Sequence, residues 1–212
     1  SAVGDTSAAG RVLGCGGVCP STIPERIILN PTVRPATSVA ITWRTTAAVS
    51  SAGIQVAIVT RSGRPDQNPA AVPATTEPVT VGPGITVFHH STLLERLTPE
   101  TRYAYRVGSD AGWSEWNQFR TASEEKKGFL FVYLGDPQGE VRSLCSRVFQ
   151  AAFRKASQAD FWLFVGDLVD NGDRDEEWAE WFDALGWIPR TIPMALIPGN
   201  HEYPDRRFLN GE

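Results

Sequence analysis

Three glycines in the second half of the sequence each close an apolar run and each precede a residue that can bind a metal ion. The three segments are Gly135-Asp136, Gly166-Asp167 and Gly199-Asn200-His201-Glu202. Carboxylate and carboxamide oxygens are hard donors that suit Mg, Mn, Fe or Zn, and an aspartate between two metal ions can bridge them. The residue types therefore predict a metal site that uses Asp136, Asp167 and Asn200.

The apolar runs before these glycines are predicted to be strands of one sheet. Phe129–Leu134 is a continuous apolar run, as expected for a strand covered on both faces, and Phe161–Val165 and Pro193–Ile197 are two more such runs. Segments with helical spacing lie between them, and this alternation is typical of α/β proteins. Ligands of an open α/β sheet bind outside the carboxyl ends of the strands, so the three polar segments should face one crevice.

Two amphipathic helices are expected between these strands. The apolar positions of the first are Val141, Leu144, Cys145, Val148, Phe149, Ala152, Phe153 and Ala156. For the second, Asp173 and Glu176 form an acidic variant of the capping box, and Gly186 ends the helix. Its inner stripe contains Trp178, Trp181, Phe182 and Leu185. Their helical spacing favours a core role over a ligand platform.

The first half of the chain has the alternating pattern of an antiparallel β-sandwich. Apolar residues recur at every second position in three runs: Val39, Ile41 and Trp43; Ile54, Val56 and Ile58; and Tyr103, Tyr105 and Val107. The segment Leu97–Tyr105 is similar to the tyrosine corner of fibronectin type III domains, in which a tyrosine hydroxyl bonds to upstream backbone. We expect a leader over 1–21, a fibronectin type III-like domain over 22–121 and an α/β domain over 128–212, after the charged linker Ser123–Gly128.

Composition limits the partners of the protein. The 212 residues contain 24 acidic and 20 basic side chains, a net charge of −4, which argues against nucleic acid or an anionic membrane as the main partner. No apolar run is long enough to span a membrane, and Ser1–Gly10 lacks the features of a signal peptide. Cys15 and Cys19 could form a short disulfide, a metal pair or two free thiols; we favour the disulfide and expect a secreted or periplasmic protein whose signal is absent from this chain.

The three polar segments, taken in order, resemble the first three motifs of the calcineurin-like metallophosphoesterases. The second motif reads Gly166-Asp167-Leu168-Val169-Asp170, and the third reads Gly199-Asn200-His201-Glu202. A fibronectin-like domain in front is similar to purple acid phosphatases, so the resemblance covers about residues 22–212. It implies that Asp136 binds one metal ion, Asp167 bridges two and Asn200 binds the second. It also implies that His201 donates a proton or contacts phosphate, that a metal-bound hydroxide attacks phosphorus, and that the domain is of α/β/β/α type.

The sequence departs from the family pattern at two positions near the site. Asp170 stands where purple acid phosphatases carry a tyrosine, so we do not expect a ferric tyrosinate centre. Gln138 stands where many members carry a histidine and could offer a carbonyl oxygen or bond to a bound water. We therefore expect two metal ions of open identity (Fe, Zn, Mn or Mg), with Gln138 and Asp170 as further metal ligands or supporting groups.

The three histidines of the chain set a further expectation. His89 and His90 are adjacent and should point to opposite faces of a strand, which favours structural roles. No histidine follows His201, whereas the family takes further ligands from downstream histidines. We expect an N-terminal fragment of a longer polypeptide whose missing C-terminal part completes an incomplete α/β domain; the alternative is a degenerate relative.

The predicted function is hydrolysis of small phosphomonoesters at acidic to neutral pH, as in acid phosphatases. A phosphodiesterase or nucleotidase of the same fold is one alternative. A catalytically inactive secreted binding module is another. The sequence carries no signal for an oligomeric state.

Overall fold

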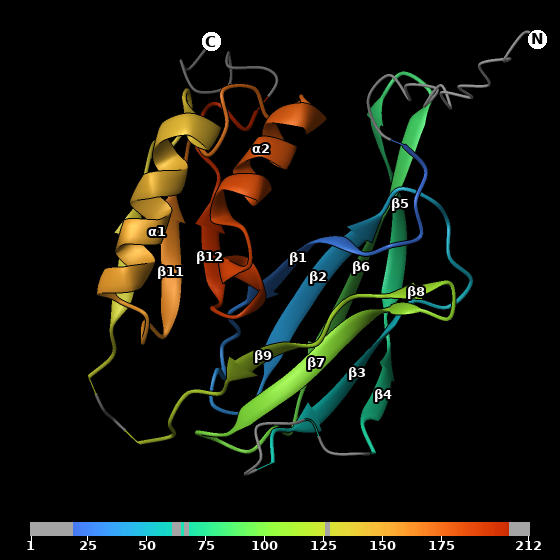
Figure 1. Cartoon of the computed structure of the whole chain (residues 1–212), viewed down its shortest axis with the longest axis vertical. Coiled ribbons are helices and arrows are strands. Elements are labelled where there is room, and N and C mark those ends of the chain that lie inside the picture. The colour runs from blue at the N-terminus through green and yellow to red at the C-terminus, as the bar shows by residue number, and fades with distance from the viewer. Residues whose placement is uncertain (1–18, 61–64, 66–67, 126–127, 204–212) are drawn as a thin grey trace, which may run out of the picture.

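The computed structural model describes residues 19–60, 65, 68–125 and 128–203. The chain passes first through a β-sandwich and then through a smaller sheet with two helices, and these two parts lie side by side (Figure 1). Cys19 is disulfide-bonded, whereas Cys15 lies outside the described residues. Within the described ranges, no helix is long and apolar enough to cross a membrane.

The sandwich consists of two antiparallel sheets. The first has the order β1 (Glu25–Asn30), β2 (Val39–Thr45), β6 (Ile85–Leu94) and β5 (Thr75–Gly82). The second has the order β4 (Ala70–Pro73), β3 (Gly53–Ile58), β7 (Arg102–Ser109) and β8 (Gly112–Trp113), and β9 (Asn117–Arg120) also pairs with β7. The predicted all-β sandwich is thus confirmed.

The alternating residues of the sandwich face its interior with one exception. The buried ones are Val39, Ile41, Trp43, Ile54, Val56, Tyr103, Tyr105 and Val107. The prediction is wrong for Ile58, which is 49% exposed because it is the last residue of β3, at the rim of the sheet. The hydroxyl of Tyr103 accepts a hydrogen bond of 2.8 Å from the amide of Thr98, as the tyrosine corner predicts.

The second part contains a parallel sheet in the order β10 (Phe131–Leu134), β11 (Phe161–Val165) and β12 (Met194–Ile197). A π-helical turn, η1 (Val141–Cys145), leads into α1 (Ser146–Lys155), and α2 (Asp175–Leu185) is followed by the 3-10 turn η2 (Ile188–Arg190). Both helices pack on one face of the sheet, over the buried side chains of Phe149, Trp162, Phe164, Trp181, Leu185 and Met194. Parallel pairing brings the carboxyl ends of all three strands to one edge.

Two details of the helices differ from the expected ones. Leu144 and Val148 are 55% and 52% exposed, because the π-helical turn and the edge position of α1 leave them outside the core. The capping box is wrong: α2 begins at Asp175, its N-cap is Arg174, and no side chain caps it. The inner stripe of α2 is part of the core, and Gly186 ends the helix with a φ of 60°.

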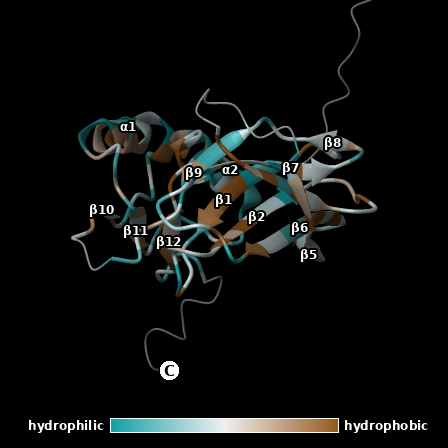
Figure 2. Cartoon of the chain, turned by 90° about the horizontal axis from the view of Figure 1, so that it is seen from below, coloured by the Kyte–Doolittle hydropathy of each residue, from teal (hydrophilic) through white to brown (hydrophobic). Residues whose placement is uncertain are grey.

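The sheet of the second part has one uncovered face. β10 begins at Phe131 rather than Phe129, and the expectation that it is covered on both faces is wrong, since Phe131 and Tyr133 are 40% and 63% exposed. Ile197 of β12 is 50% exposed. No element of the described ranges covers this face, which Figure 2 shows on the side of the sheet away from α1.

Strand β1 joins the two parts. Ile27 and Leu29 point into the sandwich core, whereas Ile28 belongs to the core of the α/β part. A bulge between Glu25 and Ile28, with Arg26 at a φ of 51°, turns the Arg26 side chain toward α2. Alternate side chains of the edge strand β1 therefore belong to the two different cores.

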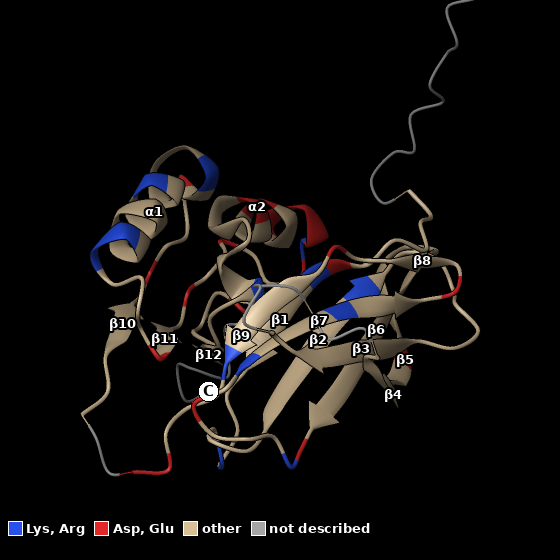
Figure 3. Ribbon diagram, turned by 60° about the horizontal axis from the view of Figure 1, so that its bottom comes forward, with Lys and Arg blue, Asp and Glu red and all other residues tan. Residues whose placement is uncertain are grey.

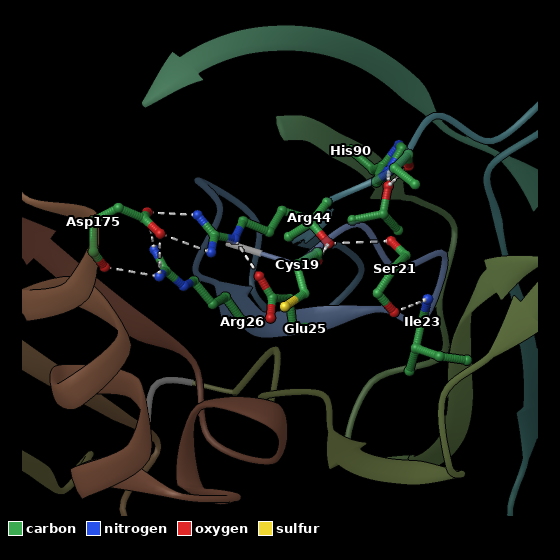
Figure 4. Close-up of polar contacts among 11 residues, drawn as sticks. Cys19, Ser21, Ile23, Glu25, Arg26, Arg44, His90 and Asp175 are labelled. Carbon is green, nitrogen blue, oxygen red and sulfur yellow. Dashed lines mark hydrogen bonds and ion pairs between the residues drawn. The ribbon is translucent and has the colours of Figure 1, made fainter. Parts of the chain in front are cut away.

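Charged side chains complete the contact between the two parts. Arg26 and Arg44 both bind Asp175, in the first turn of α2, at 2.8 Å and 2.6 Å (Figure 4). Figure 3 shows strands β1 and β2, which carry these two arginines, beside the acidic N-terminal turn of α2. An open cleft of about 700 Å³ adjoins this cluster, and none of the predicted metal ligands lines it.

Candidate metal centre

The predicted ligands follow the strand ends in unusual backbone conformations. Asp136, after β10, and Asp167, after β11, both have a φ of 51°, and Gly166 has a φ of 93°. Left-handed conformations cost energy in residues other than glycine, and such strain is concentrated at functional sites. Both aspartates thus leave their strands in a sharp turn at the same edge of the sheet.

Hydrogen bonds connect the three strand-end loops. The amide of Asp136 donates to the carbonyl of Gly166 (3.2 Å), and that of Gln138 donates to the carbonyl of Asp167 (3.1 Å). The amide of His201 donates to Oδ1 of Asp167 at 2.9 Å. The structure therefore brings the segments of Asp136, Asp167 and Asn200 to one edge, as the topology predicts.

Gly199 allows the closest of these approaches. A Cβ atom at this position would overlap Oδ1 of Asp167. Asn200, the next residue, is exposed, as is Asp136, whereas Asp167 is half-buried. The site thus has one aspartate held between two loops and two more donors at its open side.

His201 is held with a defined tautomer. Its Nδ1 lies 2.8 Å from the carbonyl oxygen of Asp170. A carbonyl can only accept, so Nδ1 carries the proton, and in the neutral ring Nε2 carries the lone pair. The side chain of Asp170 accepts a bond of 3.1 Å from the amide of Gly139, which ties the loop after β11 to the loop after β10.

The donors present fit hard divalent cations. Oε1 of Gln138 is buried without a hydrogen-bond partner within the described part of the chain, and such an atom is costly unless an ion or water satisfies it. Asp136, Asp167 and Asn200 add oxygen donors. Among the described residues, no three His, Cys, Asp or Glu side chains lie close enough together to hold a metal ion.

Two acidic residues have contacts that the sequence analysis did not assign. Glu202 accepts backbone hydrogen bonds from both the β11 and the β12 loops, although only its place in the third motif marked it. Asp175 accepts hydrogen bonds from two arginines of the sandwich. The sequence marks Asp175 only as an acidic residue near the start of a helix, and this position does not reveal a partner that is distant in the sequence.

Burial and charge shift the pKa of Asp175. Desolvation by burial would raise the pKa, but hydrogen bonds from Arg44 and the charge of Arg26 lower it below the ordinary value. The pKa of Arg26 is lowered, chiefly by burial and by the neighbouring Arg44. Asp175 is thus the anion that allows two cations to be buried together.

Comparison with known proteins identifies both parts. The purple acid phosphatase N-terminal domain family matches residues 24–121, and the calcineurin-like phosphoesterase family matches residues 129–212. Acid phosphatase type 7 of Danio rerio is 33% identical over 127 residues, which are 55% of this chain and 27% of the relative. The probable inactive purple acid phosphatase 9 of Arabidopsis thaliana is 31% identical over 125 residues, 52% of this chain and 19% of the relative.

Solved structures agree on the fold. The purple acid phosphatase PPD1 from yellow lupin (Lupinus luteus) seeds superposes with a TM-score of 0.71 at 18% identity, over 85% of this chain and 36% of that chain. The structure of PhoD gives a TM-score of 0.59 at 12% identity, over 86% and 39%. The chain thus spans well under half the length of these relatives. Its first part therefore belongs to the purple acid phosphatase N-terminal domain family, and its second part belongs to the calcineurin-like phosphoesterase family.

Proposed function

We propose that this chain supplies the first ligands of a two-metal phosphoesterase that hydrolyses small phosphomonoesters at acidic to neutral pH. The observation that carries the proposal is the hydrogen-bonded meeting of three strand-end motifs at one edge of the sheet. Asp136 would hold one cation, Asp167 would bridge two, and Asn200 would hold the second. Two bound cations would lower the pKa of water toward neutrality and neutralise phosphoryl charge.

His201 and two neighbouring residues act beside the cations in this proposal. The Asp170 carbonyl would orient the His201 ring through Nδ1–H, and the imidazolium form of the ring would give its Nε2 proton to the leaving oxygen of the substrate. Gln138, whose Oε1 is buried and unbonded in the described structure, would bind a cation through that oxygen or accept a hydrogen bond from a water beside the cation.

Domain limits and compartment belong to the same proposal. We assign residues 22–121 to the fibronectin type III-like domain and 128–212 to the phosphoesterase domain, with 1–21 as a leader. The disulfide at Cys19 supports an oxidising compartment, such as the periplasm or the extracellular space. The remaining ligands of a complete site would come from residues outside the three motifs.

Replacement of Asp167 tests the proposal. In the natural protein that carries this sequence, Asp167→Asn should remove bound metal and lower p-nitrophenyl phosphate hydrolysis by at least about 100-fold, because the bridging charge is lost. Metal is counted by elemental analysis of the purified protein. The control is Asp173→Asn, an exposed carboxylate next to α2, which should change neither. Full metal content and activity in Asp167→Asn would refute the site.

The substrate class is tested with the same protein. Faster hydrolysis of p-nitrophenyl phosphate than of its bis ester supports a phosphomonoesterase, and the reverse supports a phosphodiesterase. An inactive binding module remains the second candidate, because one relative is named a probable inactive purple acid phosphatase. A wild-type protein with neither metal nor turnover would favour that candidate.

A further inference from the structure

The carboxylate of Glu202 accepts hydrogen bonds from four backbone amides on two loops. Its Oε2 lies 2.9 Å from the amide of Asp167 and 2.6 Å from that of Gly199. Its Oε1 lies 2.7 Å from the amide of Leu168 and 3.3 Å from that of Val169. One side chain therefore binds the loop after β11 and the loop after β12 at the same time.

The backbone after β11 forms a concavity suited to an anion. Gly166 and Asp167 have φ values of 93° and 51°, and the amides of residues 167, 168 and 169 all donate to Glu202. Successive N–H groups that converge after a left-handed turn make an anion-binding nest. Here the anion is a side chain of the protein, so the nest is filled before any phosphate arrives.

The chain passes close to Glu202 again at Gly172. The amide of Gly172 donates to the carbonyl of His201 (2.9 Å), and a Cβ at Gly172 would overlap the backbone of Glu202. His201 in turn donates to Oδ1 of Asp167. Movement of the Glu202 carboxylate would therefore release both the aspartate and the histidine of the proposed site.

We propose that Glu202 is a positioning residue that fills the nest after β11 and so sets Asp167 against Asn200 and His201. The carboxylate also keeps the nest closed to phosphate, so that substrate phosphate binds at the cations. This inference rests on the proposed function for its effect on metal affinity. We call the four hydrogen bonds between the Glu202 carboxylate and the backbone amides the clamp. The clamp forms without metal and is therefore measured in the metal-free protein.

Two substitutions distinguish the loss of the Glu202 hydrogen bonds from a general loss of stability. Glu202→Gln keeps the shape of the side chain, but its amide nitrogen cannot accept, so one pair of amides, either 167 with 199 or 168 with 169, loses its acceptor. Hydrogen exchange of that pair should accelerate at least about tenfold, and Mn²⁺ affinity should fall by about 10- to 100-fold. Glu180→Gln, an exposed carboxylate on α2, is the matched control and should change neither quantity.

Chemical rescue tests the nest. Glu202→Ala empties it, so acetate or inorganic phosphate should slow the exchange of amides 167–169, and acetate should recover part of the Mn²⁺ affinity. Acetamide should do neither, because it has no charge. In the wild type and in Glu202→Gln the nest is full, and acetate should have no effect.

The outcomes distinguish the two levels of inference. Unchanged amide exchange in Glu202→Gln would overturn the clamp, whatever the activity. Accelerated exchange with selective rescue by acetate supports it even if Glu202→Ala is too unstable to assay for turnover, because Glu202→Gln retains the packing. A wild-type protein that binds no Mn²⁺ would refute the proposed function, while amide exchange would still decide the clamp.

Discussion

At the scale of single residues, His90 combines deep burial with a titratable ring. It is 1% exposed, its two ring nitrogens lie 3.0 Å and 2.8 Å from the hydroxyls of Thr45 and Thr76, and it stacks on Trp43. Burial and the neighbouring His89 lower its pKa from 6.5 to about 4. The ring is therefore neutral in the folded sandwich at pH values where the unfolded chain protonates it.

This shift predicts that the sandwich loses stability on acidification. As the pH falls below 6.5, His90 binds a proton in the unfolded chain, but in the folded sandwich it binds one only near pH 4. The free energy of unfolding therefore falls by up to about 3 kcal/mol between these two pH values. His90→Gln removes this contribution. Urea unfolding of both proteins at pH 4, 5, 6 and 7 measures it; equal slopes in the two proteins would contradict the assignment.

At the scale of elements, the N-terminal turn of α2 holds the two parts of the chain together. The side chains of Arg44, Arg26 and Asp175 are only 4%, 12% and 13% exposed. Arg44 also binds Glu25, and hydrogen bonds to Asp175 and Glu25 raise its pKa despite the opposite effect of burial. A second contact, from the hydroxyl of Tyr105 to the carbonyl of Arg190 at 2.8 Å, joins β7 to η2.

Loss of Asp175 should therefore destabilise both parts together. Asp175→Ala leaves Arg26 without its carboxylate partner and leaves Arg44 with Glu25 alone, and we expect a loss of about 3 to 5 kcal/mol in the free energy of unfolding. Calorimetry should show one transition becoming two, with Asp173→Ala as the unaffected control. A change below about 1 kcal/mol would mean that the arginines find another partner.

The lowered pKa of Asp175 also sets the acid limit of this contact. Its contribution is complete above the unfolded value of about 3.9 and is lost as the pH falls through the lower folded value. The interface should thus persist through the mildly acidic range in which the sandwich core already weakens. The two effects concern different pH windows and can be measured separately.

At the scale of the whole molecule, one face of the parallel sheet is apolar and uncovered. Phe131, Tyr133 and Ile197 are 40%, 63% and 50% exposed, and Phe131 stacks on Phe161 at 5.2 Å between ring centroids. Contiguous apolar surface of this kind is rare on a monomeric soluble protein. A polypeptide of these 212 residues alone should therefore self-associate.

Charged substitutions on this face should suppress the association. Tyr133→Glu combined with Ile197→Glu should yield monomers in sedimentation velocity at concentrations where the wild type associates, because a charged face resists burial. Val33→Glu, at a sandwich position that is 97% exposed, should leave the association unchanged. A wild-type polypeptide that stays monomeric at every concentration would contradict the prediction.

Element type and the strand ends that carry the candidate ligands were predictable from local patterns. The apolar run 161–165 coincides with β11, the alternation at Val39, Ile41 and Trp43 lies on β2, and the tyrosine corner forms as expected. The start of α2 was not predictable in this way: the expected capping box at Asp173 does not form, the helix begins at Asp175, whose side chain binds two arginines, and no side chain caps it. The exposure of Leu144 likewise depends on a π-helical turn that periodicity does not reveal.

Local patterns in the sequence identify the candidate metal-binding residues and the strand ends that carry them, because residue chemistry and hydrophobic period are local properties. The contacts that hold those residues in place arise from the packing of segments that are distant in the sequence. Glu202 meets amides 33 to 35 residues away, and Asp175 meets Arg44 and Arg26, which are 131 and 149 residues away. Contacts over such separations depend on how the sheets and helices pack, and no local pattern encodes them.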